Sequence, residues 1–266
     1  MTPWTPARRR GEERIDDPAL DPGVLVRSLE DVARSNALFG GRRAVLAALA
    51  PALAEARAEA RGAALTLLDV GTGLGDIPWH ARRLAERAGV RLATFGVELS
   101  APLAAASRAR VTASVCAAAF ALPFADRSVD VVTASQVLHH FEWPEARRLL
   151  AELDRVARRL VIVGDLRRSY AAAAGFWAAS RLLRFHPVTR HDGVLSVFRG
   201  FTAGELAAAV RAAAPGARDV RVRHRLGWRV VASWRPGPAP AAAGAGAGEL
   251  LVTPPAAPRR ASALLR

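Results

Sequence analysis

Apolar residues recur along this chain with two different periods. In two early segments, 24–38 and 42–60, valine, leucine and alanine return at helical spacing. Further along, short apolar runs alternate with further helical patterns, one of which places Ile77, Ala81 and Ala85 on one helix face. This alternation of periods predicts strands and helices in regular succession.

Seven of the apolar runs are predicted to be strands. A regular succession of strand and helix predicts a parallel sheet that helices cover on both faces. The last two runs are joined only by a short turn at Leu226-Gly227, which predicts an antiparallel hairpin. We therefore expect an α/β fold with a doubly wound, mostly parallel seven-stranded sheet, a terminal antiparallel hairpin and N-terminal helices. The expected strands are 65–70, 91–98, 111–116, 129–134, 159–164, 218–224 and 228–234.

The two ends of the chain differ in composition from its middle. Residues 1–22 are polar, charged and contain proline, and residues 235–266 are almost wholly proline, alanine, glycine and arginine. Neither end has the varied large apolar residues that a packed core needs, so both are predicted to be disordered tails. Residues 23–234 are predicted to form one domain with a substantial core.

Composition excludes several kinds of chemistry. The chain of 266 residues has a formal net charge of +14, and all 38 of its basic residues are arginine. Without lysine there is no P-loop of the GxxxxGK[ST] type and no Schiff base. The single cysteine, Cys116, excludes an intrachain disulfide and a Cys-rich zinc site. No apolar run reaches ~18 residues and the N-terminus lacks the apolar core of a signal peptide, so we expect a cytoplasmic protein without a membrane span.

A glycine-rich stretch follows the first predicted strand. The segment "LTLLDVGTGLGD", residues 65–76, places Gly71, Gly73 and Gly75 at alternate positions. Ligands of doubly wound sheets bind beyond the carboxyl ends of the strands, where such a turn exposes backbone N–H groups at a helix start. The spacing is G-x-G-x-G, unlike the G-x-G-x-x-G of dinucleotide-binding proteins. Glu98 ends the second predicted strand, where a carboxylate can accept hydrogen bonds from both hydroxyls of a ribose.

Four segments, taken together, resemble the class I S-adenosylmethionine-dependent methyltransferases. They read "LLDVGTGLGDIP", "GVELS", "LPFADRSVDVVTASQVLHHF" and "VIVGDL", in the order and spacing of that family. The resemblance covers about residues 65 to 165, and its style is closest to small-molecule methyltransferases of ubiquinone and menaquinone biosynthesis. It implies a Rossmann-like methyltransferase domain over residues 23–234 with an N-terminal helical lid, and S-adenosyl-L-methionine as the cofactor.

The resemblance also implies which residues bind the cofactor. The glycine-rich turn would line the methionine end, Glu98 would hold the ribose, and Phe120 would lie beside the adenine. Gln136 and Leu138 would close over cofactor and acceptor. Family members commonly carry an acid that accepts from the adenine amino group, but Ala118 stands there in this chain, so a backbone carbonyl or water must substitute. The full implied set is Asp69, Gly71, Thr72, Gly73, Gly75, Glu98, Leu99, Ala119, Phe120 and Gln136.

Two adjacent histidines follow the fourth predicted strand. Because neighbouring residues point in different directions, at most one of His139 and His140 is expected to face the acceptor. We predict that His140 is a general base and that Asp165, at the end of the fifth strand, holds its imidazole in one tautomer. His139 is the second candidate. No metal is expected, because the strand-end aspartates of magnesium-dependent catechol-type enzymes are missing.

The expected acceptor is a small molecule. The segment "TASQVLHH" lacks the [DN]-P-P-[YFW] motif with which amino-methylating nucleic-acid enzymes hold a planar amino group. What remains is an aromatic or lipid-like acceptor, methylated on oxygen or carbon in secondary metabolism or quinone-type biosynthesis. The N-terminal helices and residues 166–205 supply apolar side chains to roof its pocket. Within that segment, His186, Arg190, His191 and Asp192 form either a substrate lid or a hydrogen-bonded surface loop.

Two other functions remain open. The net positive charge favours an RNA methyltransferase, although no RNA-binding module is visible and nucleic acid is not the expected partner. The alanine at Ala118 favours a protein that binds the cofactor without catalysis.

Overall fold

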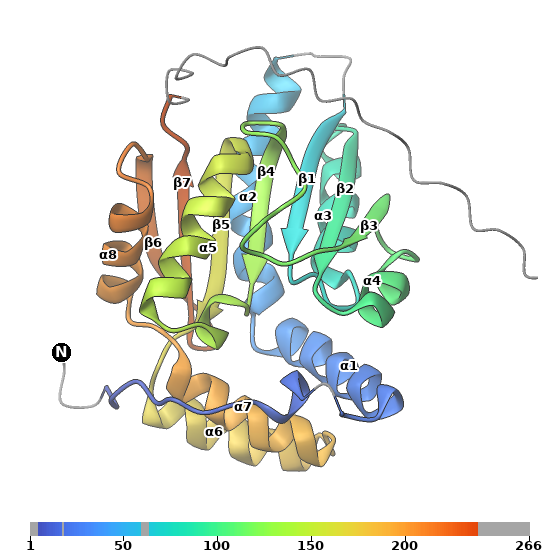
Figure 1. Ribbon diagram of the computed structural model, residues 1–266, viewed down its shortest axis with the longest axis vertical. Coiled ribbons are helices and arrows are strands. Elements are labelled where there is room, and N and C mark those ends of the chain that lie inside the picture. The colour runs from blue at the N-terminus through green and yellow to red at the C-terminus, as the bar shows by residue number, and fades with distance from the viewer. Residues whose placement is uncertain (1–4, 18, 60–63, 239–266) are drawn as a thin grey trace, which may run out of the picture.

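The computed structural model describes residues 5–17, 19–59 and 64–238 (Figure 1). Its strands are β1 (Leu65–Val70), β2 (Leu92–Glu98), β3 (Ala113–Cys116), β4 (Val129–Ser135), β5 (Ala157–Leu166), β6 (Arg218–Arg225) and β7 (Arg229–Arg235). Its α-helices are α1 (Pro22–Leu38), α2 (Gly41–Ala58), α3 (Asp76–Arg87), α4 (Ala101–Ser107), α5 (Trp143–Val156), α6 (Tyr170–Leu182), α7 (Pro187–Arg199) and α8 (Ala203–Ala213). Two short 3-10 helices are η1 (Arg14–Asp16) and η2 (Leu138–His140).

The strands form a seven-stranded sheet in the order β3-β2-β1-β4-β5-β7-β6. Strands β1 to β5 are parallel, and β7 runs antiparallel to both β5 and β6. The predicted doubly wound sheet with its terminal hairpin is therefore confirmed. The strand order reverses between β1 and β4, which is the switch point at which ligands bind in such sheets.

Helices cover both faces of the sheet (Figure 1). Helices α2 and α3 pack on one face, where Val45, Leu49 and Leu53 of α2 share a buried cluster with Leu67 and Ile162 of the strands. Helices α5 and α8 pack on the other face. The core thus lies in two layers on either side of the sheet, as the helical periodicity predicts.

Helix α5 illustrates how local sequence sets these elements. Leu149, Leu150 and Leu153 return at helical spacing and are fully buried. Pro144 falls in the first turn, where its missing N–H would have no helical partner in any case. The carboxylate of Glu145 accepts a hydrogen bond from the backbone N–H of Glu142 at 3.2 Å, which satisfies a free donor at the helix start.

A helical cap covers the carboxyl edge of the sheet, at the bottom of Figure 1. Helices α6 and α7 connect β5 to α8, and α1 packs against α7. The tip of the β6–β7 hairpin reaches this cap. Gly227 at the tip has a φ of 73°, and a Cβ there would lie 1.9 Å from the carbonyl oxygen of Phe39. Only glycine allows the hairpin to approach the end of α1 so closely.

The N-terminal segment differs from the expected disordered tail. Residues 5–17 pack across the cap (Figure 1). Asp192 of α7 accepts hydrogen bonds from the backbone N–H groups of the first two residues of η1, at 3.0 and 2.9 Å. Arg199, at the end of α7, donates to the carbonyl oxygen of Gly11 at 2.7 Å. Polar contacts from the cap therefore order a segment that has almost no apolar core of its own, and composition does not reveal them. The predicted C-terminal tail lies outside the described residues from position 239 onward.

In the described part of the chain, no single helix is long and apolar enough to cross a membrane. Helices α1 and α2 are long and apolar enough to span a membrane only when taken together, and the chain bends by 63° between them.

Candidate active site

The turn between β1 and α3 carries the three glycines of the sequence motif. Gly71, Gly73 and Gly75 have φ angles of 68°, 55° and 76°, a region that other residues seldom adopt. At Gly71, a Cβ would also lie 2.4 Å from a methyl carbon of Val137. The missing side chain therefore lets the turn pack directly against the loop that follows β4.

Asp69 and Thr72, both in the expected cofactor set, are buried beside this turn, with exposures of 1% and 4%. The carboxylate of Asp69 accepts hydrogen bonds from the hydroxyls of Thr72 (2.9 Å) and Thr133 (2.6 Å). Burial raises the pKa of Asp69 to about 7. In this arrangement the two side chains fix the glycine turn to β1 and β4.

Two further acids border the turn. Glu98, the last residue of β2, accepts a hydrogen bond from the backbone N–H of Gly73. Asp76, at the start of α3, has a buried Oδ2 without a hydrogen-bond partner among the described residues. Burial raises the pKa of both carboxyl groups. S-adenosylmethionine carries ribose hydroxyls, an ammonium and a sulfonium, so buried carboxylates that are short of donors fit this cofactor.

The expected adenine side of the site lies where β2 and β3 end. Leu99 is 76% exposed, and Ala119 and Phe120 are half-buried. The ring of Phe120 packs edge-on against Phe141, with centroids 4.8 Å apart. Ala118 is exposed, and its carbonyl oxygen accepts the N–H three residues further on at 3.2 Å. Since a carbonyl oxygen has two lone pairs, this backbone acceptor can take a second hydrogen bond.

The loop after β4 contains Gln136 and Leu138, of which the first contacts α1 and the second lies in the core. Gln136 has a φ of 59°, and its side-chain Nε2 donates to Oδ1 of Asn36 in α1. Leu138, expected to close over cofactor and acceptor, is instead 1% exposed within the core on the α5 face. It anchors the η2 turn, because burying a leucine side chain is favourable by about 1.5–3 kcal/mol.

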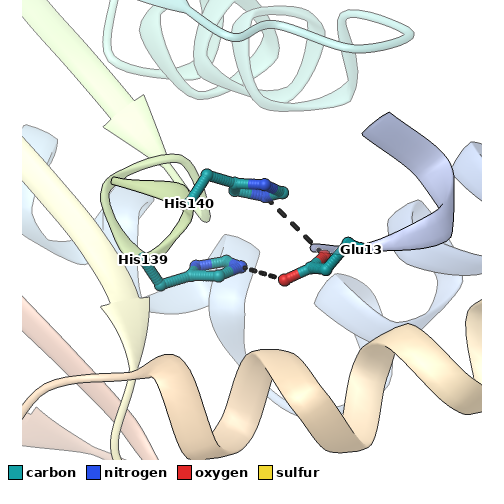
Figure 2. A group of neighbouring side chains, drawn as sticks. All are labelled: Glu13, His139 and His140. Atoms are coloured by element: carbon teal, nitrogen blue, oxygen red, sulfur yellow. Dashed lines mark ion pairs between the residues drawn. The ribbon is translucent and has the colours of Figure 1, made fainter. Parts of the chain in front are cut away.

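The η2 turn presents the two histidines (Figure 2). His139 is 2% exposed, its Nδ1 lies 2.7 Å from Oδ1 of Asp165, and its backbone N–H donates to Oδ2 of the same residue at 3.0 Å. Its Nε2 lies 3.5 Å from Glu13 of the N-terminal segment. The predicted pairing of Asp165 with His140 is therefore wrong. The turn directs the first histidine toward β5, so His139 takes the partner.

His140 has a different set of partners. Its Nδ1 lies 2.8 Å from Oδ2 of Asp16. Its Nε2 lies 3.8 Å from Oε2 of Glu13, and Figure 2 shows these two side chains facing each other. Its side chain is 23% exposed, compared with 3% for that of His139. His140 is thus the more accessible histidine.

Charge distinguishes the two histidines further. Burial by itself lowers the pKa of His139, but the charges and hydrogen bonds of Asp165 and Glu13 outweigh it and raise this pKa to about 10.

Among the described residues, Glu13, His139 and His140 form the group whose ligand atoms, within 4.8 Å of one another, could hold a metal ion. A cation would have to displace the proton of His139 and lie close to Arg199, whose Nη1 is 3.5 Å from Glu13. The charges therefore favour the ion pair.

A cavity of about 170 Å³ lies under the cap and borders this network. Glu13 and Gln136 line it, and since about 10–15 Å³ of such volume holds a water, it has room for a small organic molecule. Most of the remaining lining is apolar and comes from the N-terminal segment, the cap helices, β5 and the hairpin tip, including Ile15, Val32, Phe39, Leu166, Phe176 and Trp228.

The expected lid segment is part of the cap. Of the four residues predicted to form either a lid or a surface loop, three lie in helix α7 and His186 directly precedes it. The Nδ1 of His186 caps the helix start by accepting a hydrogen bond from the backbone N–H of Val188 at 3.3 Å. Asp192 lines the cavity, whereas His191 is exposed.

Sequence reasoning missed three polar residues of this region. Glu13 and Asp16 stand in "GEERIDDP", which has the composition of a solvated charged segment, so no local pattern identifies them. Arg229 lines the cavity, and its position in the sequence could have identified it. It opens the apolar run "RVVASW", and a charge in a buried run is uncommon unless it has a partner.

Comparison with known proteins agrees with this geometry. Residues 68–162 match the family described as methyltransferase domain. The DszA carbon methyltransferase is similar in structure, with 14% identity, a TM-score of 0.56 and coverage of 73% of this chain and 53% of that one. A SAM-dependent methyltransferase from Thermotoga maritima has 17% identity, a TM-score of 0.50 and coverage of 80% and 98%. A search of curated proteins gives no match.

The matched segment runs from β1 to β5 and contains the glycine turn, Glu98 and both histidines. The sheet around it has the strand order and the antiparallel β7 of the fold that the motifs imply. Residues 68–162 of this chain therefore match the methyltransferase domain family, within a fold that the chain shares with these solved methyltransferases.

Proposed function

We propose that this protein transfers a methyl group from S-adenosylmethionine to an oxygen or carbon atom of a small, mainly apolar acceptor, in secondary metabolism or quinone-type biosynthesis. The observation that carries the proposal is the cavity under the cap, which Glu13 and Gln136 line together with apolar side chains. Glu13 also belongs to the histidine network. A mainly apolar cavity that reaches Gln136, in the loop after β4 at the switch point, supports a small acceptor.

The residues around the β1–α3 turn would hold the cofactor. Glu98 would accept hydrogen bonds from the ribose hydroxyls, and the unpartnered Oδ2 of Asp76 would accept from the ammonium group. When bound, S-adenosylmethionine supplies a methyl group that is already activated on a sulfonium. The chain itself therefore has to align the acceptor and remove its proton, and alignment alone is worth roughly 7–11 kcal/mol in favourable cases.

His140 is the better candidate for the base. His139 keeps its proton up to about pH 10, so it is a poor proton acceptor at neutral pH. The carboxylate of Asp16, 2.8 Å from Nδ1 of His140, favours the tautomer in which Nε2 is free to take a proton. Nε2 lies 3.8 Å from Glu13, too far for a hydrogen bond, so it remains available.

The alternatives are less well supported. An RNA acceptor would have to reach a space that α1, α6, α7 and the N-terminal segment enclose with mainly apolar side chains. RNA-binding proteins instead present aromatic and basic side chains on an open surface. A protein that binds the cofactor without catalysis would not need a second, mainly apolar cavity in addition to the cofactor site.

The proposal is tested by incubating the protein with methyl-labelled S-adenosylmethionine and either a panel of phenols and 1,3-dicarbonyl compounds or bulk RNA. We expect label in a small acceptor. His140→Ala should lower kcat by about 10²-fold or more, because a general base is lost, while the Kd for S-adenosylhomocysteine stays within about twofold. His224→Ala, which removes an exposed histidine of β6 that does not line the cavity, is the matched control and should retain full activity.

Label in RNA alone would replace this proposal with an RNA methyltransferase. Cofactor binding without transfer to either class would indicate a non-catalytic protein. Full turnover by His140→Ala on the accepted molecule would exclude His140 as the base and leave alignment as the sole contribution of the chain.

A further inference from the structure

Arg229 is a buried arginine at the carboxyl edge of the sheet. It is the first residue of β7, which runs antiparallel to β5 and therefore begins at this edge, opposite Leu166. It is 3% exposed and lines the cavity under the cap. The proposed cofactor site and the proposed base make no use of it.

Two of the three nitrogens of this side chain have no hydrogen-bond partner among the described residues. Its Nε and Nη1 are buried and unbonded within the described part of the chain. The two acids that line the same cavity are occupied by other groups: Glu13 by His139, and Asp192 by the backbone of η1. Asp165 attracts the charge, but its oxygens already bond His139 and the backbone. The protein itself therefore leaves donors of a buried cation unsatisfied.

Such a charge is unfavourable in the free protein. Burial lowers the pKa of Arg229 to about 10, which still leaves it protonated at neutral pH. A buried charge without its full set of hydrogen bonds costs much more stability than a neutral side chain of the same size. Buried polar atoms are nearly always satisfied, so an exception on a cavity wall indicates a ligand that completes it.

Other features of the same cavity support a ligand. Thr189 also lines the cavity, and its Oγ1 is buried without a hydrogen-bond partner among the residues that the structure describes. Gln136 and Trp228 line it with φ angles of 59° and 52°, a left-handed conformation that is strained for these side chains. Backbone strain of this kind persists where the surrounding structure holds it, which is common at ligand sites.

We propose that Arg229 binds a carboxylate group of the acceptor, so that the molecule methylated is an acid with an apolar aromatic or aliphatic body. A guanidinium binds carboxylates through paired, charge-assisted hydrogen bonds. The side chains of Phe39, Leu166 and Trp228 would receive the apolar body in the same cavity. This inference rests on the proposed function in taking the cavity as the acceptor site.

The carboxylate that binds Arg229 could also belong to the cofactor, because S-adenosylmethionine carries a carboxylate of its own. The mainly apolar lining favours the acceptor, since an amino acid moiety would bring its ammonium into the same cavity. The experiment therefore measures acid binding and cofactor binding separately.

Two matched ligand pairs, 2-naphthoate with 2-naphthamide and octanoate with octanamide, test the proposal by calorimetry without cofactor. The wild-type protein should bind at least one acid roughly tenfold or more tightly than its amide. Arg229→Met should abolish this preference while leaving amide binding unchanged, and Arg229→Lys should retain part of it. Arg223→Met, at an exposed arginine of β6, is the matched control and should behave as wild type.

The melting temperature of ligand-free Arg229→Met should rise, because an unpaired buried charge is removed, so a loss of acid binding cannot be ascribed to unfolding. The proposal is overturned if the wild-type protein prefers neither acid, or if Arg229→Met keeps the preference. It is also overturned if Arg229→Met weakens S-adenosylhomocysteine binding and leaves acid binding intact, which would assign Arg229 to the cofactor. Acid binding without methyl transfer would support the carboxylate site and count against the proposed function alone.

Discussion

At the scale of single residues, the candidate cofactor site gathers acids whose pKa values are raised. Burial raises the pKa of Asp69, Asp76 and Glu98, and each of these side chains lies around the glycine turn. Asp69 is satisfied by two hydroxyls, whereas Asp76 keeps an unpartnered oxygen. A ligand that brings hydroxyl and ammonium donors would relieve the unfavourable burial, which is the physical reason to expect the cofactor here.

Glu98 is the residue at which this reasoning is simplest to test. Glu98→Ala should weaken both S-adenosylmethionine and S-adenosylhomocysteine by about 1.5–3 kcal/mol, because hydrogen bonds to a charged acceptor are lost. Calorimetry measures this as a rise in Kd of roughly 10- to 100-fold. Glu86→Ala, at an exposed acid of α3, should leave both affinities unchanged. Equal affinities for Glu98→Ala and wild type would show that the ribose lies elsewhere.

Residues with a local sequence signal could be predicted, and residues defined by distant partners could not. The glycines and Glu98 stand out because strand ends and turn chemistry mark them. The partner of Asp165 could not be assigned between two adjacent histidines, because the choice depends on how the η2 turn rotates above β5. Glu13 acts across more than a hundred residues of chain on His139, and no short pattern encodes such a contact.

At the scale of elements, the η2 turn is held between β5 and the N-terminal segment. Asp165 at the end of β5 binds one side of His139, and Glu13 binds the other. The guanidinium of Arg199 donates to the carbonyl oxygens of His139 (3.0 Å) and His140 (2.6 Å). A charged His139 thus links three elements that are distant in sequence.

This link has a pH dependence that follows from the raised pKa of His139. The pKa is about 10 in the folded protein and about 6.5 in an unfolded chain, so the stabilisation is complete below about pH 6.5 and is lost as pH rises through 10. The free energy of unfolding of wild type should exceed that of His139→Gln by a few kcal/mol near pH 7, since roughly 1.4 kcal/mol corresponds to each pKa unit. Denaturant titrations should show this difference shrinking by pH 10.5.

The chain has no lysine, and the comparison with the variant cancels the contributions of other groups that titrate in this range, among them Asp69 and Arg229, whose pKa values are about 7 and about 10. A difference in unfolding free energy that stays constant from pH 7 to 10.5 would show that His139 is uncharged in the folded protein.

The same contrast separates the elements that could be predicted from those that could not. All seven strands and the terminal hairpin follow from periodicity, because burial on one or both faces leaves a pattern in the sequence. The N-terminal segment is ordered by hydrogen bonds to Asp192 and Arg199, and a segment held by polar contacts has no such pattern.

At the scale of the whole molecule, the positive charge is distributed through the structure as well as over it. Arg168, Arg199 and Arg229 are buried, and Arg155 and Arg159 form ion pairs with acids. Many arginines therefore bond carbonyl oxygens and carboxylates of the protein itself. A net charge of +14 counted from the sequence is thus weak support for a nucleic-acid partner.

In the proposed complex, a cofactor on the β1–α3 turn and an acceptor in the cavity meet at the η2 turn. The most direct measurement is a crystal structure of the protein with S-adenosylhomocysteine. We expect the ribose on Glu98, the homocysteine along the turn that contains Gly71, and the sulfur directed toward His140 and the cavity wall at Gln136. A sulfur directed away from the cavity, or a cofactor bound elsewhere, would exclude methyl transfer between these two sites.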